Sequence, residues 1–119
     1  MKKINLQDKF SLFSEHWTPK ILGDLNGQYL KIAKVKGEFV WHDHANEDEL
    51  FMVIKGQLKI RLKEETVVLN EGEIYIVPKG IEHKPEAKED CWILLFEPKQ
   101  TKHTGEVIDD LTVDENEWI

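Results

Sequence analysis

The chain has 119 residues, and its 16 basic and 23 acidic side chains give a formal net charge of −7. A chain of this length usually forms one domain, so we expect a single domain over residues 1–119. The acidic balance lacks the basic surface of a nucleic-acid-binding protein, and no apolar run approaches the ~18 residues that a membrane span needs. The first residues lack an apolar stretch of signal-peptide length, which predicts a cytoplasmic protein.

Two rare residue types limit the kind of site that the chain can build. Arg61 is the only arginine, so a site built on several arginines is excluded. Cys91 is the only cysteine, which excludes intramolecular disulfides and CxxC metal sites. It begins the apolar run Cys91–Phe96, so we expect a buried thiol with a raised pKa.

The expected elements are mostly short strands. Residues 5–15 place Leu6, Phe10 and Phe13 at helical spacing, which predicts a short helix or an ordered arm. Two glycine turns follow in residues 22–27, and then strands are predicted at 28–35, 38–44, 50–54, 57–62, 66–69, 73–77, 81–84 and 91–97. Short strands separated by turn residues, without alternating helices, predict an all-β sandwich or barrel. The final Trp118-Ile119 is expected to pack on the barrel or on a second subunit.

The histidines suggest a metal site. His42 and His44 lie two residues apart in a predicted strand, so both side chains project from one face. Glu47-Asp48-Glu49 follows them with carboxylates, and His83 comes after a Pro-x-Gly turn. Imidazole and carboxylate ligands together suit divalent Zn, Fe, Mn, Ni or Cu. Taken alone, the His-x-His pair would also fit a polar patch on a solvated strand.

The complete spacing resembles that of the cupin superfamily. Its first motif, G(X)5HXH(X)3–4E(X)6G, is matched at Gly37, His42, His44, Glu49 and Gly56. The one departure is that four residues, not five, separate the first glycine from the first histidine. Its second motif, G(X)5PXG(X)2H(X)3N, is matched with Ala87 in place of the final Asn; the other positions are Gly72, Pro78, Gly80 and His83. That Asn is not a metal ligand in the family's pattern, so its loss does not remove a ligand.

The resemblance implies a small single-domain cupin. Its fold would be a double-stranded β-helix, a jelly-roll barrel, with a core over about residues 29–97, a short N-terminal arm or helix and a C-terminal tail. It also implies four metal ligands, His42, His44, Glu49 and His83, which would leave up to two positions of an octahedral ion open. The metal would be a divalent transition ion, such as Zn, Fe, Mn or Ni. Small cupins also commonly form homodimers.

The motif requires six residues between its glutamate and the next glycine. Among the three neighbouring acidic residues, only Glu49 is separated from Gly56 by six residues. We therefore expect Glu47 and Asp48 to be solvated.

Two functions remain open at this point. One is a mononuclear metalloenzyme that acts on a small organic substrate, as an isomerase, lyase or oxygenase. The other is a non-enzymatic protein that binds a metal or a small ligand. No catalytic residue is assigned; Lys79, Glu82 and His103 are candidates for an assisting acid or base. A closed apolar pocket with a second polar group near the metal would favour an enzyme, and a wide, wet mouth would favour a binding protein.

Overall fold

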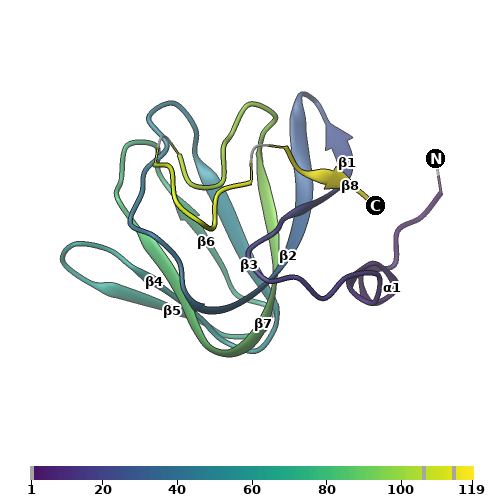
Figure 1. Cartoon of the computed structure of the whole chain (residues 1–119), viewed down its shortest axis with the longest axis horizontal. Coiled ribbons are helices and arrows are strands. Elements are labelled where there is room, and N and C mark those ends of the chain that lie inside the picture. Colours follow the sequence, from purple (N-terminus) through teal and green to yellow (C-terminus); the bar gives the residue numbers. More distant parts are fainter. Residues whose placement is uncertain (1, 106, 114) are drawn as a thin grey trace.

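The computed structural model describes residues 2–105, 107–113 and 115–119. A curved, mainly antiparallel sheet wraps around an apolar interior, and one short helix lies outside it (Figure 1). The strands are β1 (Lys20–Leu25), β2 (Gln28–Glu38), β3 (Glu49–Lys55), β4 (Leu58–Arg61), β5 (Thr66–Leu69), β6 (Ile74–Val77), β7 (Lys84–Pro98) and β8 (Glu117–Trp118). This architecture confirms the predicted all-β jelly-roll barrel.

The long strand β7 holds the barrel together. The strand order is β5-β4-β7-β2-β1-β8, and β3 pairs with both β7 and β6. Along its length β7 therefore contacts β4, β2 and β3. Successive side chains of a strand point to opposite faces, so each of these strands contributes alternate residues to the interior.

From Cys91 onward, the odd-numbered residues of β7 face the interior. Cys91, Ile93, Leu95 and Glu97 are buried, whereas the residues between them are only partly buried. In β3 the inward set is Glu49, Phe51 and Val53, as the parity of Glu49 predicts. The sequence could not choose between the two apolar faces of residues 91–97, because the outer face is covered as well.

The outer face is covered by the N-terminal segment. Helix α1 (Leu6–Phe10) begins at Asn5, whose side chain accepts a hydrogen bond from the Asp8 backbone N–H. Phe10 and Phe13 are buried against β2, and Phe10 stacks on Trp92 at 4.7 Å between ring centroids. The helix is shorter than the predicted 5–15, because the chain turns at Ser11 so that Phe13 can also reach this cluster. No helix among the described residues is long and apolar enough to cross a membrane.

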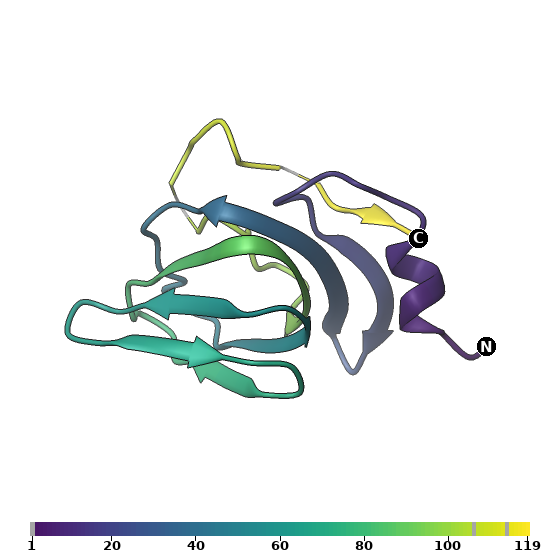
Figure 2. The same cartoon turned by 90° about the horizontal axis from the view of Figure 1, so that it is seen from below.

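The C-terminal end lies beside the helix at the same end of the molecule (Figure 2). Strand β8 pairs in parallel with β1, and the Ile119 backbone N–H donates to the Ile21 carbonyl at 3.1 Å. Trp118 packs edge-to-face on Tyr29 at 5.4 Å between centroids. The tail therefore packs on its own barrel, which is one of the two predicted alternatives.

The predicted strands differ from the structure in three places. Residues 38–44 are not a regular strand, since beyond Glu38 only His42 takes part in a β-bridge. Strand β1 was missed, because Gly23 interrupts its apolar pattern; the structure accommodates it with a register shift between Ile21 and Gly23. The predicted strands 81–84 and 91–97 are replaced by the single strand β7, because pairing with β4 and β2 continues the strand through its polar middle.

Candidate metal centre

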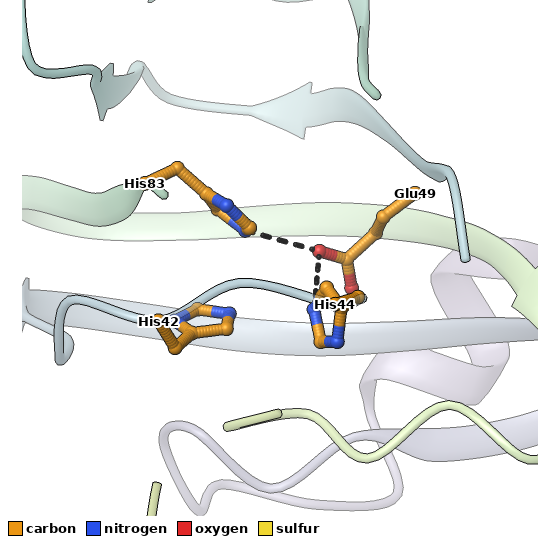
Figure 3. A group of neighbouring side chains, drawn as sticks. All are labelled: His42, His44, Glu49 and His83. Carbon is orange, nitrogen blue, oxygen red and sulfur yellow. Dashed lines mark ion pairs between the residues drawn. The ribbon is translucent and has the colours of Figure 1, made fainter. Parts of the chain in front are cut away.

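Four side chains from separate parts of the chain meet inside the barrel (Figure 3). They are His42, His44, Glu49 and His83, and one ligand atom from each lies within 4.8 Å of those of the other three. Their exposed fractions are 3%, 4%, 3% and 0%. The structure thus brings together all four side chains singled out by the sequence.

The backbone between the two motifs places the histidines. The chain around His42 runs antiparallel to the chain around His83, and the two residues exchange backbone hydrogen bonds of 3.0 and 2.9 Å. The Gly80 backbone N–H donates to the His44 carbonyl at 2.8 Å. Gly80 has a φ of +78°, a conformation that glycine adopts at little cost. Irregular pairing, rather than a predicted strand over 38–44, therefore holds these rings together.

Two of the rings have a fixed tautomer. His42 Nδ1 lies 2.9 Å from the Val40 carbonyl oxygen, and His83 Nδ1 lies 2.9 Å from that of Ile81. Because a carbonyl oxygen only accepts, each Nδ1 carries a hydrogen, and in the neutral ring Nε2 has the lone pair. A second hydrogen bond of this kind is the usual way in which a metal-binding histidine is oriented.

Several buried polar atoms of the cluster lack a well-aligned hydrogen bond within the described residues. These atoms are both ring nitrogens of His44, Nε2 of His83 and Oε1 of Glu49. Glu49 Oε1 lies 3.3 Å from His44 Nε2 and 3.4 Å from His83 Nε2. Buried polar groups are nearly always satisfied, and a cation would satisfy one nitrogen of His44 together with Nε2 of His83 and Oε1 of Glu49. The donor set and its burial therefore suit a metal ion.

The protonation states of His42 and Glu49 fit the same purpose, whereas the raised pKa of His44 makes it the ring that must lose a proton to bind a metal. Burial, with a smaller contribution from His83, lowers the pKa of His42 to about 4, so this ring is neutral at neutral pH. Burial opposes the charge on Glu49, but its contacts with Glu97, His44 and His83 outweigh burial and hold its pKa well below its usual range. For His44, burial is outweighed by the attraction of Glu49, and its pKa is raised. An anionic carboxylate and a neutral imidazole are the forms that bind metals.

Comparison with known proteins assigns the family. A family model described as "Cupin domain" matches residues 29–97. The chain belongs to the cupin family. A curated relative, the uncharacterized protein YdbB of Bacillus subtilis, is 34% identical over 82 residues, which is 68% of this chain and 73% of YdbB.

Solved structures agree with this assignment. A cupin-2 domain containing protein from Shewanella frigidimarina is 50% identical, with a TM-score of 0.80 over 81% of this chain and 94% of that chain. Protein NMB1881 from Neisseria meningitidis is 26% identical, with a TM-score of 0.75 over 82% of this chain and 100% of that chain.

A small cavity adjoins the four-residue cluster of this cupin. Its volume is about 30 Å³, which is enough for one or two water molecules. His42, Glu49 and His103 are the polar side chains in its lining, and the other lining residues are apolar: Trp17, Pro19, Ala33, Val35, Phe39, Phe51, Pro85, Ile93 and Leu95.

Of the three candidate assisting residues, His103 alone lines this cavity. The Val113 backbone N–H donates to His103 Nε2 at 2.7 Å, so in the neutral ring the hydrogen is on Nδ1. Burial, followed by the charge of Lys31, lowers the pKa of His103 to about 4. Lys79 and Glu82 are exposed, and Glu82 forms an ion pair with Lys63.

The neighbouring acidic residues of the first motif lie outside the cluster. Asp48 is exposed and accepts a hydrogen bond from the Lys79 backbone N–H at 2.9 Å. Glu47 is half-buried. Asp48 is thus solvated as predicted, whereas Glu47 is more covered than expected.

Sequence reasoning missed two charged residues beside the cluster. Lys31 and Glu97 form an ion pair of 2.8 Å, and their side chains are 2% and 0% exposed. Burial and the neighbouring charge of Glu49 raise the pKa of Glu97 well above its usual range. A signal was present, since Lys31 shares strand parity with the buried Ala33 and Glu97 with the buried Leu95.

Proposed function

We propose that this cupin binds one divalent transition metal through His42, His44, Glu49 and His83, and acts as an enzyme on a small organic molecule. One observation carries the proposal: four buried donors, several of them without a partner, adjoin an apolar cavity whose further polar residue is His103. A largely apolar pocket with few polar groups is typical of small-molecule sites. A non-enzymatic binding protein is the alternative, and it would be expected to have a wider and wetter opening.

Each residue has a role under this proposal. The carbonyl groups of Val40 and Ile81 hold His42 and His83 so that Nε2 faces the cluster. When bound, the metal would supply Lewis-acid chemistry or bind an oxygen of the substrate. His103, with a hydrogen on Nδ1, would donate a hydrogen bond to a polar atom of the substrate.

The cavity also limits the substrate. No lysine or arginine lines it among the described residues, and apolar side chains form most of its wall. These features favour a neutral, largely apolar molecule over a phosphorylated or carboxylated one.

Metal analysis tests the proposal first. The purified protein is stripped with a chelator, dialysed against Zn²⁺, Mn²⁺, Fe²⁺ or Ni²⁺, and its metal content is measured by mass spectrometry. We expect about one ion per chain for the wild type and for the control Glu47→Ala, and none for His42→Ala/His44→Ala, because two ligands are lost. Absence of metal from the wild type, or equal loss in both variants, would refute the ligand assignment.

Turnover separates the enzyme from the binding protein. The metal-loaded protein is incubated with a panel of small neutral carbonyl and phenolic compounds, with and without dioxygen, and products are detected by mass spectrometry. An enzyme gives products that disappear in His42→Ala/His44→Ala and decrease in His103→Phe. A compound that binds without conversion under any of these conditions would support the alternative.

We also propose that the protein is a cytoplasmic homodimer, as predicted from the sequence. The N-terminal helix and Ile119 pack on their own barrel, and the apolar side chains that stay exposed include Ile74 and Ile76 of β6, at 55% and 52%, as well as Trp118 at 53%. Sedimentation of the wild type beside Ile74→Glu/Ile76→Glu tests this proposal. A wild-type monomer at micromolar concentration would contradict it.

A further inference from the structure

The buried ion pair between Lys31 and Glu97 needs an explanation other than stability. Its two side chains are 2% and 0% exposed, and they lie inside the barrel beside the four-residue cluster. Removing two charges from water costs several kcal/mol each, and apolar residues of similar volume often give equal or greater stability. Two buried charges are therefore poorly explained by their contribution to folding.

Strand register places the pair next to the cluster. Strands β3 and β7 are antiparallel, with Leu50 opposite Phe96. Continuing this register by one residue puts Glu49 opposite Glu97. On the other side of β7, Lys31 is opposite Leu95 and thus diagonal to Glu97. Opposite and diagonal neighbours on one face of a sheet are within side-chain contact. Lys31, Glu97 and Glu49 therefore form a row across three strands on the inner face.

The row restrains the carboxyl group of Glu49. The register places Glu97 directly beside Glu49 on the inner face, and Lys31 Nζ donates to Glu97 Oε1 at 2.8 Å. Lys31 thus fixes Glu97, and the fixed Glu97 borders Glu49. Next to this neighbour, Glu49 places Oε1 at 3.3 Å from His44 Nε2 and 3.4 Å from His83 Nε2.

We propose that Glu97, supported by Lys31, is a positioning residue that orients the Glu49 carboxylate for metal binding. This inference rests on the proposed function. Glu97 is not assigned as a ligand, because its carboxyl group acts through Glu49. Lys31 balances the negative charge that two adjacent carboxyl groups would otherwise concentrate inside the barrel.

A double substitution tests this role without leaving a buried charge. In Lys31→Met/Glu97→Leu, apolar side chains of similar size replace both members of the pair. We expect the metal-free variant to unfold in urea at the same or a higher concentration than the wild type. Its affinity for Zn²⁺, measured by competition with a chromophoric chelator, should fall about 10- to 100-fold, as found for residues that orient metal ligands. The visible absorption spectrum of the Co²⁺-loaded protein should change as well.

Two further variants make the result specific. Glu97→Gln places an amide, which can donate a hydrogen bond to the Glu49 carboxylate, at the same position and should recover most of the affinity. Lys20→Met removes another buried lysine, which pairs with Glu15 and Glu117 away from the cluster, and should leave the affinity and the Co²⁺ spectrum unchanged. Wild-type affinity and spectrum in the double variant would overturn the positioning role alone. A wild type that binds no metal would instead overturn the proposed function.

Discussion

Replacement of Gly105 by alanine should weaken both the fold and metal binding. Gly105 has a φ of +62°, and a Cβ at this position would overlap the backbone carbonyl oxygen of Asp43. Asp43 lies between His42 and His44. The added methyl group must therefore displace either the C-terminal segment or the backbone that carries two of the proposed ligands.

The expected magnitude has two parts. A left-handed conformation costs a residue with a Cβ about 1–2 kcal/mol relative to glycine. Overpacking against a rigid neighbour adds about 1–3 kcal/mol. Gly27→Ala is a matched control, because Gly27 has a φ of +81° but nothing within 4 Å of an added Cβ. The free energy of unfolding of Gly27→Ala should fall only by the conformational cost, whereas that of Gly105→Ala should fall by about 2–5 kcal/mol in total.

Urea unfolding followed by tryptophan fluorescence measures the loss of stability, and chelator competition measures Zn²⁺ affinity. We expect Gly105→Ala to be the less stable variant and the one with weakened metal binding, while Gly27→Ala binds metal like the wild type. Equal destabilisation with unchanged affinity in both variants would refute the close contact between the C-terminal segment and Asp43.

Other predictions concern residues away from the cluster. Burial raises the pKa of Cys91 to about 12, so its thiol should react with a disulfide reagent at pH 8 only in urea; fast reaction of the folded protein would contradict this. Phe10→Ala should lower the free energy of unfolding by about 3–5 kcal/mol, because Phe10 is fully buried against Trp92. His16→Ala should cost less than about 1 kcal/mol, since its ion pair with Asp90 is exposed; a larger loss in urea unfolding would contradict that reasoning.

The sequence predicted the barrel because its short strands alternate clearly. Residues 57–62, for example, place Leu58 and Ile60 on one face, and both are fully buried in β4. Local patterns failed where pairing across the barrel decides the structure. The segment around His42 reads as a strand, yet its neighbours in the fold provide only a single β-bridge, with His83.

The candidate site was predictable for a different reason. Its four residues lie at the spacings of the two cupin motifs, and these spacings can be read along the chain. Lys31 and Glu97 are 66 residues apart and meet only through the pairing of β2 with β7. Such a contact depends on strand register, which periodicity alone does not determine. The same limit explains why His103 was only one of three equal candidates.

The small cavity has a consequence for the rate of binding. A volume of about 30 Å³ holds no more than one or two water molecules, so a larger substrate would fit fully inside only if the wall moved. Trp17 and Phe39, which stack at 4.6 Å between centroids, belong to that wall. When opening precedes binding, the observed association rate reaches a plateau as ligand concentration rises. The plateau would report how often the barrel opens, a property of the protein and not of the substrate.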